Sequence, residues 1–147
     1  MIKLSTGLQG AVLGYHGVRA MMNRGVIDIY STPRPESPDK AVTGTLLARV
    51  TKDGGTFAPN QGANGLILNQ RIDGSLADTG DWYLSGMVQG AATWWRWKWS
   101  LYDNDQDSLY YPRVDGDVGE SLILPTRTIT VGLKTKIDEF NLTFGVC

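Results

Sequence analysis

The stretch Thr93-Trp-Trp-Arg-Trp-Lys-Trp-Ser-Leu-Tyr102 decides the fold class of this chain. Side chains of one parity are apolar, namely Trp95, Trp97, Trp99 and Leu101, and those of the other parity are mixed, namely Trp94, Arg96, Lys98, Ser100 and Tyr102. Successive side chains of a β-strand point to opposite faces of its sheet. The stretch therefore predicts a strand whose apolar face lies in the core.

Outward from this strand, the chain has the pattern of many short strands separated by turns. Eighteen glycines and six prolines interrupt it at short intervals. We expect strands over residues 26–30, 45–51, 66–68, 109–114, 122–124, 128–133 and 136–144, and a short one near Met87 and Val88. A register change is expected near Asp138 and Glu139. Without alternating helices, this pattern predicts an all-β fold, an antiparallel β-sandwich of jelly-roll type.

The first residues form the one helix candidate, over residues 5–24, with Ser5 or Thr6 as the cap and Gly25 at the end. Its four glycines weaken an isolated helix. Two interpretations follow: a terminal helix docked on the domain, or an arm that grips another subunit. We expect a single domain over residues 1–147, with residues 1–25 as helix or arm and residues 26–147 as the β-sandwich.

The charge balance argues against several classes of partner. Fourteen Lys and Arg residues are interspersed with fifteen Asp and Glu residues, whereas proteins that bind nucleic acid normally carry a basic excess. No run of eighteen apolar residues is present, so no membrane partner is expected. Cys147 is the only cysteine, which excludes a disulfide within the chain.

Catalytic and metal-binding patterns are weak. His16 is the sole histidine and has no nearby nucleophile in the sequence. Asp103-Asn-Asp-Gln-Asp107 has the spacing that opens a calcium loop, but Ser108 and Val114 stand where that loop needs Gly and Glu. A solvated turn is the preferred interpretation, with a weak calcium site as the alternative. We expect a protein that is not an enzyme, with no catalytic residue, cofactor or metal.

The mixed face of the tryptophan-rich strand is the candidate protein interface. Its aromatic and cationic side chains are too apolar together for free exposure, so a loop or a neighbouring subunit should cover them. Stacking on a sugar is the alternative. Cys147 either is inert or forms a disulfide between subunits. The candidate interface residues are Trp94, Arg96, Lys98, Tyr102 and Cys147.

Segments along most of the chain resemble small virion proteins of tailed phages, encoded among head and tail genes. They are Leu4-Ser-Thr-Gly-Leu-Gln9, Gly25-Val-Ile-Asp-Ile-Tyr-Ser31, Thr43-Gly-Thr-Leu-Leu-Ala-Arg-Val50, Thr93-Trp-Trp-Arg-Trp97, Arg113-Val-Asp-Gly-Asp-Val-Gly119, Leu122-Ile-Leu124, Thr128-Ile-Thr-Val131 and Lys136-Ile-Asp-Glu-Phe-Asn-Leu-Thr143. Such turn and strand motifs specify a fold better than an activity.

The resemblance implies a structural role in the virion, assembled in the host cytoplasm. The implied partners are further copies of the chain and other virion proteins such as the major capsid protein. A capsid decoration or cement protein is the leading expectation. A neck or tail accessory protein and a carbohydrate-binding attachment module are the alternatives.

Overall fold

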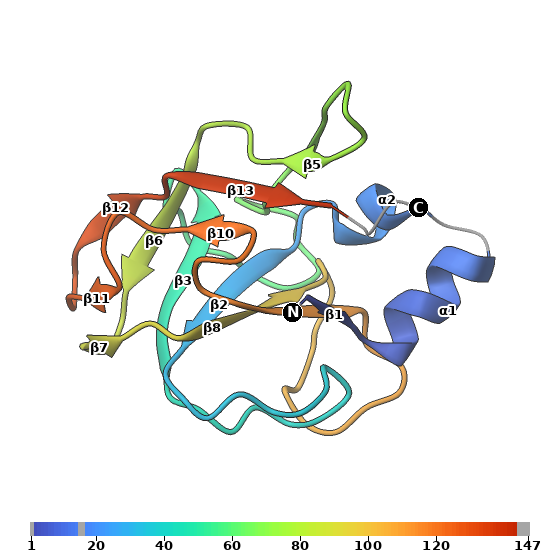
Figure 1. The fold of residues 1–147 in the computed structure, drawn as a ribbon, viewed down its shortest axis with the longest axis horizontal. Coiled ribbons are helices and arrows are strands. Elements are labelled where there is room, and N and C mark those ends of the chain that lie inside the picture. The colour runs from blue at the N-terminus through green and yellow to red at the C-terminus, as the bar shows by residue number, and fades with distance from the viewer. Residues whose placement is uncertain (1, 15–16, 144–147) are drawn as a thin grey trace.

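The computed structural model describes residues 2–14 and 17–143, and most of its regular structure is antiparallel β-sheet (Figure 1). The large sheet has the strand order β1 (Lys3–Leu4), β9 (Arg113–Asp117), β8 (Trp94–Lys98), β2 (Val26–Tyr30), β3 (Leu46–Lys52), β6 (Trp82–Gly86) and β12 (Lys134–Lys136). A smaller sheet has the order β10 (Leu122–Ile123), β13 (Glu139–Leu142), β5 (Leu76–Ala77) and β4 (Asn69–Gln70). Strands β11 (Thr128–Ile129) and β7 (Gly90–Ala91) form a separate pair. The predicted all-β antiparallel sandwich is confirmed.

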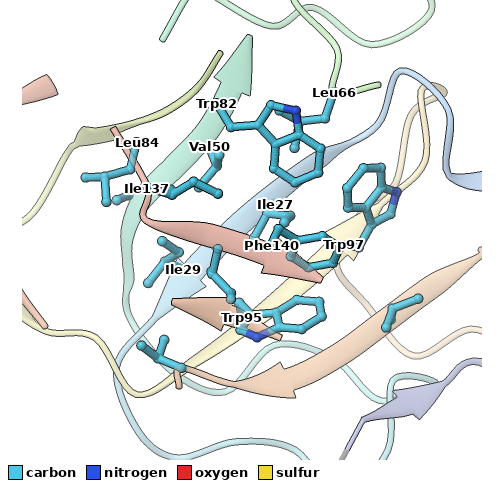
Figure 2. Packing of buried hydrophobic residues seen from close by; sticks show 14 of the residues in the cluster. Ile27, Ile29, Val50, Leu66, Trp82, Leu84, Trp95, Trp97, Ile137 and Phe140 are labelled. Carbon is cyan, nitrogen blue, oxygen red and sulfur yellow. The ribbon is translucent and has the colours of Figure 1, made fainter. Parts of the chain in front are cut away.

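An aromatic cluster fills the space between the two main sheets. Phe140 of β13 lies among Trp82, Trp95 and Trp97, with ring-centroid distances of 5.2, 5.6 and 6.2 Å (Figure 2). All four side chains are at most 1% exposed. Aromatic rings combine a large buried area with favourable edge and offset contacts. The apolar parity of β8 therefore faces the core, as predicted for Trp95 and Trp97.

The strand predictions are best in the centre of the sheet. Strand β2 has the predicted bounds, and β3 is shifted by one residue. Strands β12 and β13 are separate, and Asp138 lies between them, so the predicted break in register is present. The predicted strand over residues 66–68 is wrong: Leu66 forms an isolated bridge to Gly25, and the strand nearby is the two-residue β4.

The alternation also predicted that residues 93–102 and 109–114 pair as a long hairpin around the turn at residues 103–107. Strands β8 and β9 do pair antiparallel, but over residues 94–98 and 113–117, so the predicted extent of both strands is wrong. Strand β8 ends at Lys98, and residues 99–112, here named the acidic loop, leave the sheet before β9 begins at Arg113. Trp99 is half-buried and Leu101 is 44% exposed, although their parity predicted core positions. Asp103 initiates a local turn by accepting a hydrogen bond from the Asp105 amide at 2.8 Å.

Helical residues near the N-terminus form two short helices, α1 (Thr6–Gly14) and α2 (Val18–Met22). Ser5 is the cap: its Oγ accepts a hydrogen bond from the Leu8 amide at 3.1 Å and donates one to the Tyr111 carbonyl at 2.8 Å. Leu8 and Met22 are buried in the hydrophobic core. The described part of this segment is therefore docked on the sheet of its own chain, and its contact with another subunit stays a prediction. His16 lies outside the described residues.

Candidate functional site

A row of alternating charges crosses the face of the large sheet opposite the aromatic core. Arg49 of β3, Asp28 of β2, Arg96 of β8, Asp115 of β9 and Lys3 of β1 are register partners in that order. In β3, β2, β8 and β9, the charged residue of this row is flanked in the sequence by residues that lie on the core face of the sheet. Opposite charges on adjacent strands are thus paired by the register of the sheet.

Arg96 and Asp115 form a fully buried ion pair in this row. Arg96 Nε and Nη2 donate to the two carboxylate oxygens at 2.7 and 2.9 Å, and neither side chain is exposed. Arg96 Nη1 donates to the Lys40 carbonyl at 3.0 Å. Bidentate geometry and the third hydrogen bond satisfy a guanidinium that would otherwise be costly to bury.

Asp28 forms a second buried centre with two cations. It accepts hydrogen bonds from Arg49 Nε and Nη2 at 2.6 and 3.1 Å, and Lys98 Nζ lies 2.7 Å from it. Burial opposes ionisation of Asp28, but the charges of Lys98 and Arg49 outweigh it and lower the pKa of this carboxyl. Burial likewise opposes the charge of Lys98, while Asp28 and Asp105 raise its pKa.

Two loops are attached to the sheet through these charges. Arg113 donates to both oxygens of Asp103 at 2.8 and 2.7 Å, to the Pro38 carbonyl at 2.9 Å and to the Gln106 carbonyl at 2.8 Å. It therefore holds the acidic loop together with the segment that precedes β3, residues 31–45, here named the proline loop. In Figure 1 both loops run along the lower side of the large sheet. The row of charges is a structural network in which the carboxylates have cationic partners.

Three of the predicted interface residues lie inside this network. Trp94 and Arg96 are 0% exposed and Lys98 is 7% exposed. Trp94 stacks on Tyr30 at 4.5 Å and donates to the Ser31 carbonyl at 2.8 Å. The chain's own loops cover this face, so these three side chains do not form a surface for a partner, and that part of the interface prediction is wrong.

The other two candidate interface residues are Tyr102 and Cys147. Tyr102 is 60% exposed, so its contact with a partner stays a prediction. Cys147 lies outside the described residues, and its disulfide also stays a prediction.

The three carboxylates of the acidic loop diverge to different partners. Asp103 pairs with Arg113, Asp105 with Lys98, and Asp107 accepts a hydrogen bond from the Ala41 amide at 2.7 Å. Within the part of the chain that is described, no group of three His, Cys, Asp or Glu side chains could hold a metal ion. The same described residues include no helix that is both long and apolar enough to cross a bilayer.

An uncharged surface lies where α1 meets the acidic loop. We name it the α1–Tyr110 face; its residues are Thr6, Gly7, Gly10, Ala11, Met21, Trp99, Leu109, Tyr110 and Pro112. Leu109 and Tyr110 are 72% and 70% exposed, and a groove of about 390 Å³ runs between the helix and the loop.

The rings of Trp99, Tyr110 and Tyr111 hold the loop side of this face in shape. They contact one another edge to face, with centroid distances of 5.6 to 6.2 Å. Gly7 allows the helix to approach the loop, because a Cβ there would lie 2.1 Å from the Tyr110 carbonyl oxygen. Sequence patterns did not reveal the face, since its two halves are about a hundred residues apart in the chain.

Comparison with known proteins found no matching family model, no matching curated protein and no matching solved structure. The chemistry of the chain's own surfaces is therefore the basis for a functional proposal. Two surfaces bear on it: the α1–Tyr110 face, and a polar hollow beside Arg49 that shares Trp99 with this face.

Proposed function

We propose that this chain is a structural component of a tailed-phage virion, a capsid decoration or cement protein that acts by protein contact. Its α1–Tyr110 face contacts the same face of a second copy. The observation that carries the proposal is the exposure of Leu109 and Tyr110 at one groove whose lining is uncharged. Contiguous apolar surface on a folded protein commonly marks an interaction site.

The composition of the face supports a protein partner. None of its residues carries a charge, while the rest of the chain is rich in charged residues. Interface centres are depleted in charge and enriched in Tyr and Trp. Trp99 and Tyr110 are therefore the expected anchors of the contact.

The shape of the face supports contact between two copies. Leu109 and Tyr110, both largely exposed, line the groove together with the small residues Gly10 and Ala11. Gly10 has open space at its Cβ position, so an incoming side chain can approach the helix closely. In a two-fold contact the same patch is used twice, and Leu109 and Tyr110 of each copy can enter the groove of the other.

The virion context is supported by the sequence resemblance and by the balanced charge of the chain. A decoration protein binds a repeating surface through many modest contacts, which add up by multivalency. The neck and tail locations use the same kind of contact and remain the rival within this class.

Immunogold electron microscopy tests the proposed location. Antibodies against the chain are applied to particles purified from an infected culture of the source host. Regular labelling over the capsid is the expected result. Labelling confined to the neck or tail would contradict the decoration role, and particles without label would contradict a virion role altogether.

A further inference from the structure

A polar hollow lies next to the α1–Tyr110 face and shares Trp99 with it. Two adjacent cavities, of about 170 and 250 Å³, share Arg49 and Phe57 in their walls. The first is lined by aromatic side chains, including Trp99 and Tyr102. The residues around the second include Thr51, Thr56 and Ser85, which carry hydroxyl groups. We name the pair the Arg49–Phe57 hollow.

The polar groups of the hollow are held in place by buried partners. Arg49 is fixed by its two hydrogen bonds to Asp28, and its guanidinium carbon lies 5.9 Å from the centre of the Phe57 ring. Among the described residues, Arg49 Nη1 has no hydrogen-bond acceptor. Lys98 donates to Asp105 at 3.1 and 3.2 Å, and the Asp105 side chain remains 38% exposed. Fixed donors and acceptors of this kind are preorganised for a polar ligand.

The charge of the lining indicates which ligand chemistry fits. The first cavity has two cations, Arg49 and Lys98, and two carboxylates, Asp103 and Asp105. Their charges balance, so neither an anion nor a cation is favoured as such. A neutral ligand that both donates and accepts hydrogen bonds, and that offers apolar C–H faces to aromatic rings, satisfies both features of the lining. Carbohydrates have this combination.

We propose that the Arg49–Phe57 hollow binds a neutral oligosaccharide. Each cavity is smaller than the roughly 300–1,000 Å³ of drug-sized ligand sites, which corresponds to one sugar ring in each. The wall shared by the two cavities lies between neighbouring rings, so at least two linked sugars are bound. The site does not depend on the proposed contact between copies, because the α1–Tyr110 face shares Trp99 alone with it.

The test is an NMR titration of the full chain that follows the indole N–H signal of Trp99. The probes are three neutral trisaccharides, namely maltotriose, cellotriose and N,N′,N″-triacetylchitotriose, with the anionic trigalacturonate as a charged comparison. We expect at least one neutral trisaccharide to shift the Trp99 signal saturably. We also expect trigalacturonate to bind more weakly than that sugar.

Matched variants locate the binding. Phe57→Ala and Tyr102→Ala should each weaken the affinity for that trisaccharide by about tenfold, as expected for loss of an anchoring ring. Leu109→Ala, at an exposed residue that lines the neighbouring groove but not the hollow, should change it less than about twofold. The proposal is overturned if none of the neutral trisaccharides shifts the signal, if trigalacturonate binds most tightly, or if Leu109→Ala weakens binding as much as Tyr102→Ala. Unchanged melting temperatures confirm that the variants are folded.

Discussion

Arg96 and Asp115 face each other across β8 and β9 and form two hydrogen bonds, of 2.7 and 2.9 Å, with neither side chain exposed to solvent. Transfer of either charge from water into this layer is costly, and the partner compensates for it. Loss of one partner leaves the other as an uncompensated buried charge. The pair is therefore a sensitive point in the stability of the sheet.

Asp115→Asn should lower the free energy of unfolding by about 3–5 kcal/mol, because it leaves the Arg96 guanidinium buried without its carboxylate. The control is Arg71→Ala, which removes a pair to Glu139 at 3.8 Å in which both side chains are about half exposed. That change should cost less than about 1 kcal/mol. Urea unfolding followed by circular dichroism measures both, and equal losses would contradict the assigned role of the network.

Asp28 should make the protein sensitive to acid. Its pKa is lowered in the folded protein, since Lys98 and Arg49 outweigh the effect of burial. The stabilisation is therefore complete above the unfolded pKa, near 3.9, and is lost as the pH falls through the lower folded pKa. We expect the free energy of unfolding to fall below about pH 4, with a slope of up to ~1.4 kcal/mol per pH unit from this group.

The matched variant for this pH dependence is Asp28→Asn. It should be less stable at neutral pH, and its stability should depend less on pH in the acid range than that of the parent protein. Urea unfolding at a series of pH values from neutral to strongly acid provides the comparison. Parallel curves for the two proteins below pH 4 would show that another carboxyl is responsible.

Substitution by Ala at two glycines of α1 should change the stability of the protein in opposite directions. At Gly7 a Cβ would lie 2.1 Å from the Tyr110 carbonyl oxygen, so Gly7→Ala forces the helix or loop to move and should cost about 1–3 kcal/mol. At Gly10 nothing lies within 4 Å of a Cβ, so Gly10→Ala should stabilise the protein by up to about 1 kcal/mol through helix propensity. Melting temperatures show the signs, and an increase in both would disprove the close packing at Gly7.

Replacing Trp97 and replacing Trp99 should have different effects on stability, although strand alternation places both side chains on the same face. Trp97 is 1% exposed and contacts Phe140, so Trp97→Ala should cost about 3–5 kcal/mol. Trp99 is half-buried beyond the end of β8, so Trp99→Ala should cost about 1 kcal/mol. Denaturant unfolding of the two variants checks the order, and a larger loss for Trp99 would place it in the core instead.

The sequence predicted the fold class because alternation is a local signal. Trp95 and Trp97 were assigned correctly to the core on this basis. The end of the strand was missed because Trp99 and Leu101 continue the alternation, while the turn after them is fixed by the pair between Asp103 and Arg113, which depends on tertiary structure.

The sequence indicated that the mixed face of β8 is covered, but it did not reveal the network of charges beneath the covering loops. Apolar and charged residues in alternation are typical of a strand with one face in water. The available clue was that successive strands carry opposite charges, as at Asp28, Arg49, Arg96 and Asp115. Recognising it requires the register of the strands, which the sequence alone does not provide. The α1–Tyr110 face similarly depends on contact between the first and last thirds of the chain.

Sedimentation velocity over a wide range of protein concentration tests most directly the claim that this chain acts by contact with further copies of itself. We expect a sedimentation coefficient that rises with concentration from that of the 16.1 kDa monomer towards that of the dimer. Tyr110→Glu should abolish the rise by placing a charge in the contact, while Tyr102→Glu, also at an exposed tyrosine, should not. A monomer at all concentrations, or a rise that persists in Tyr110→Glu, would contradict the account.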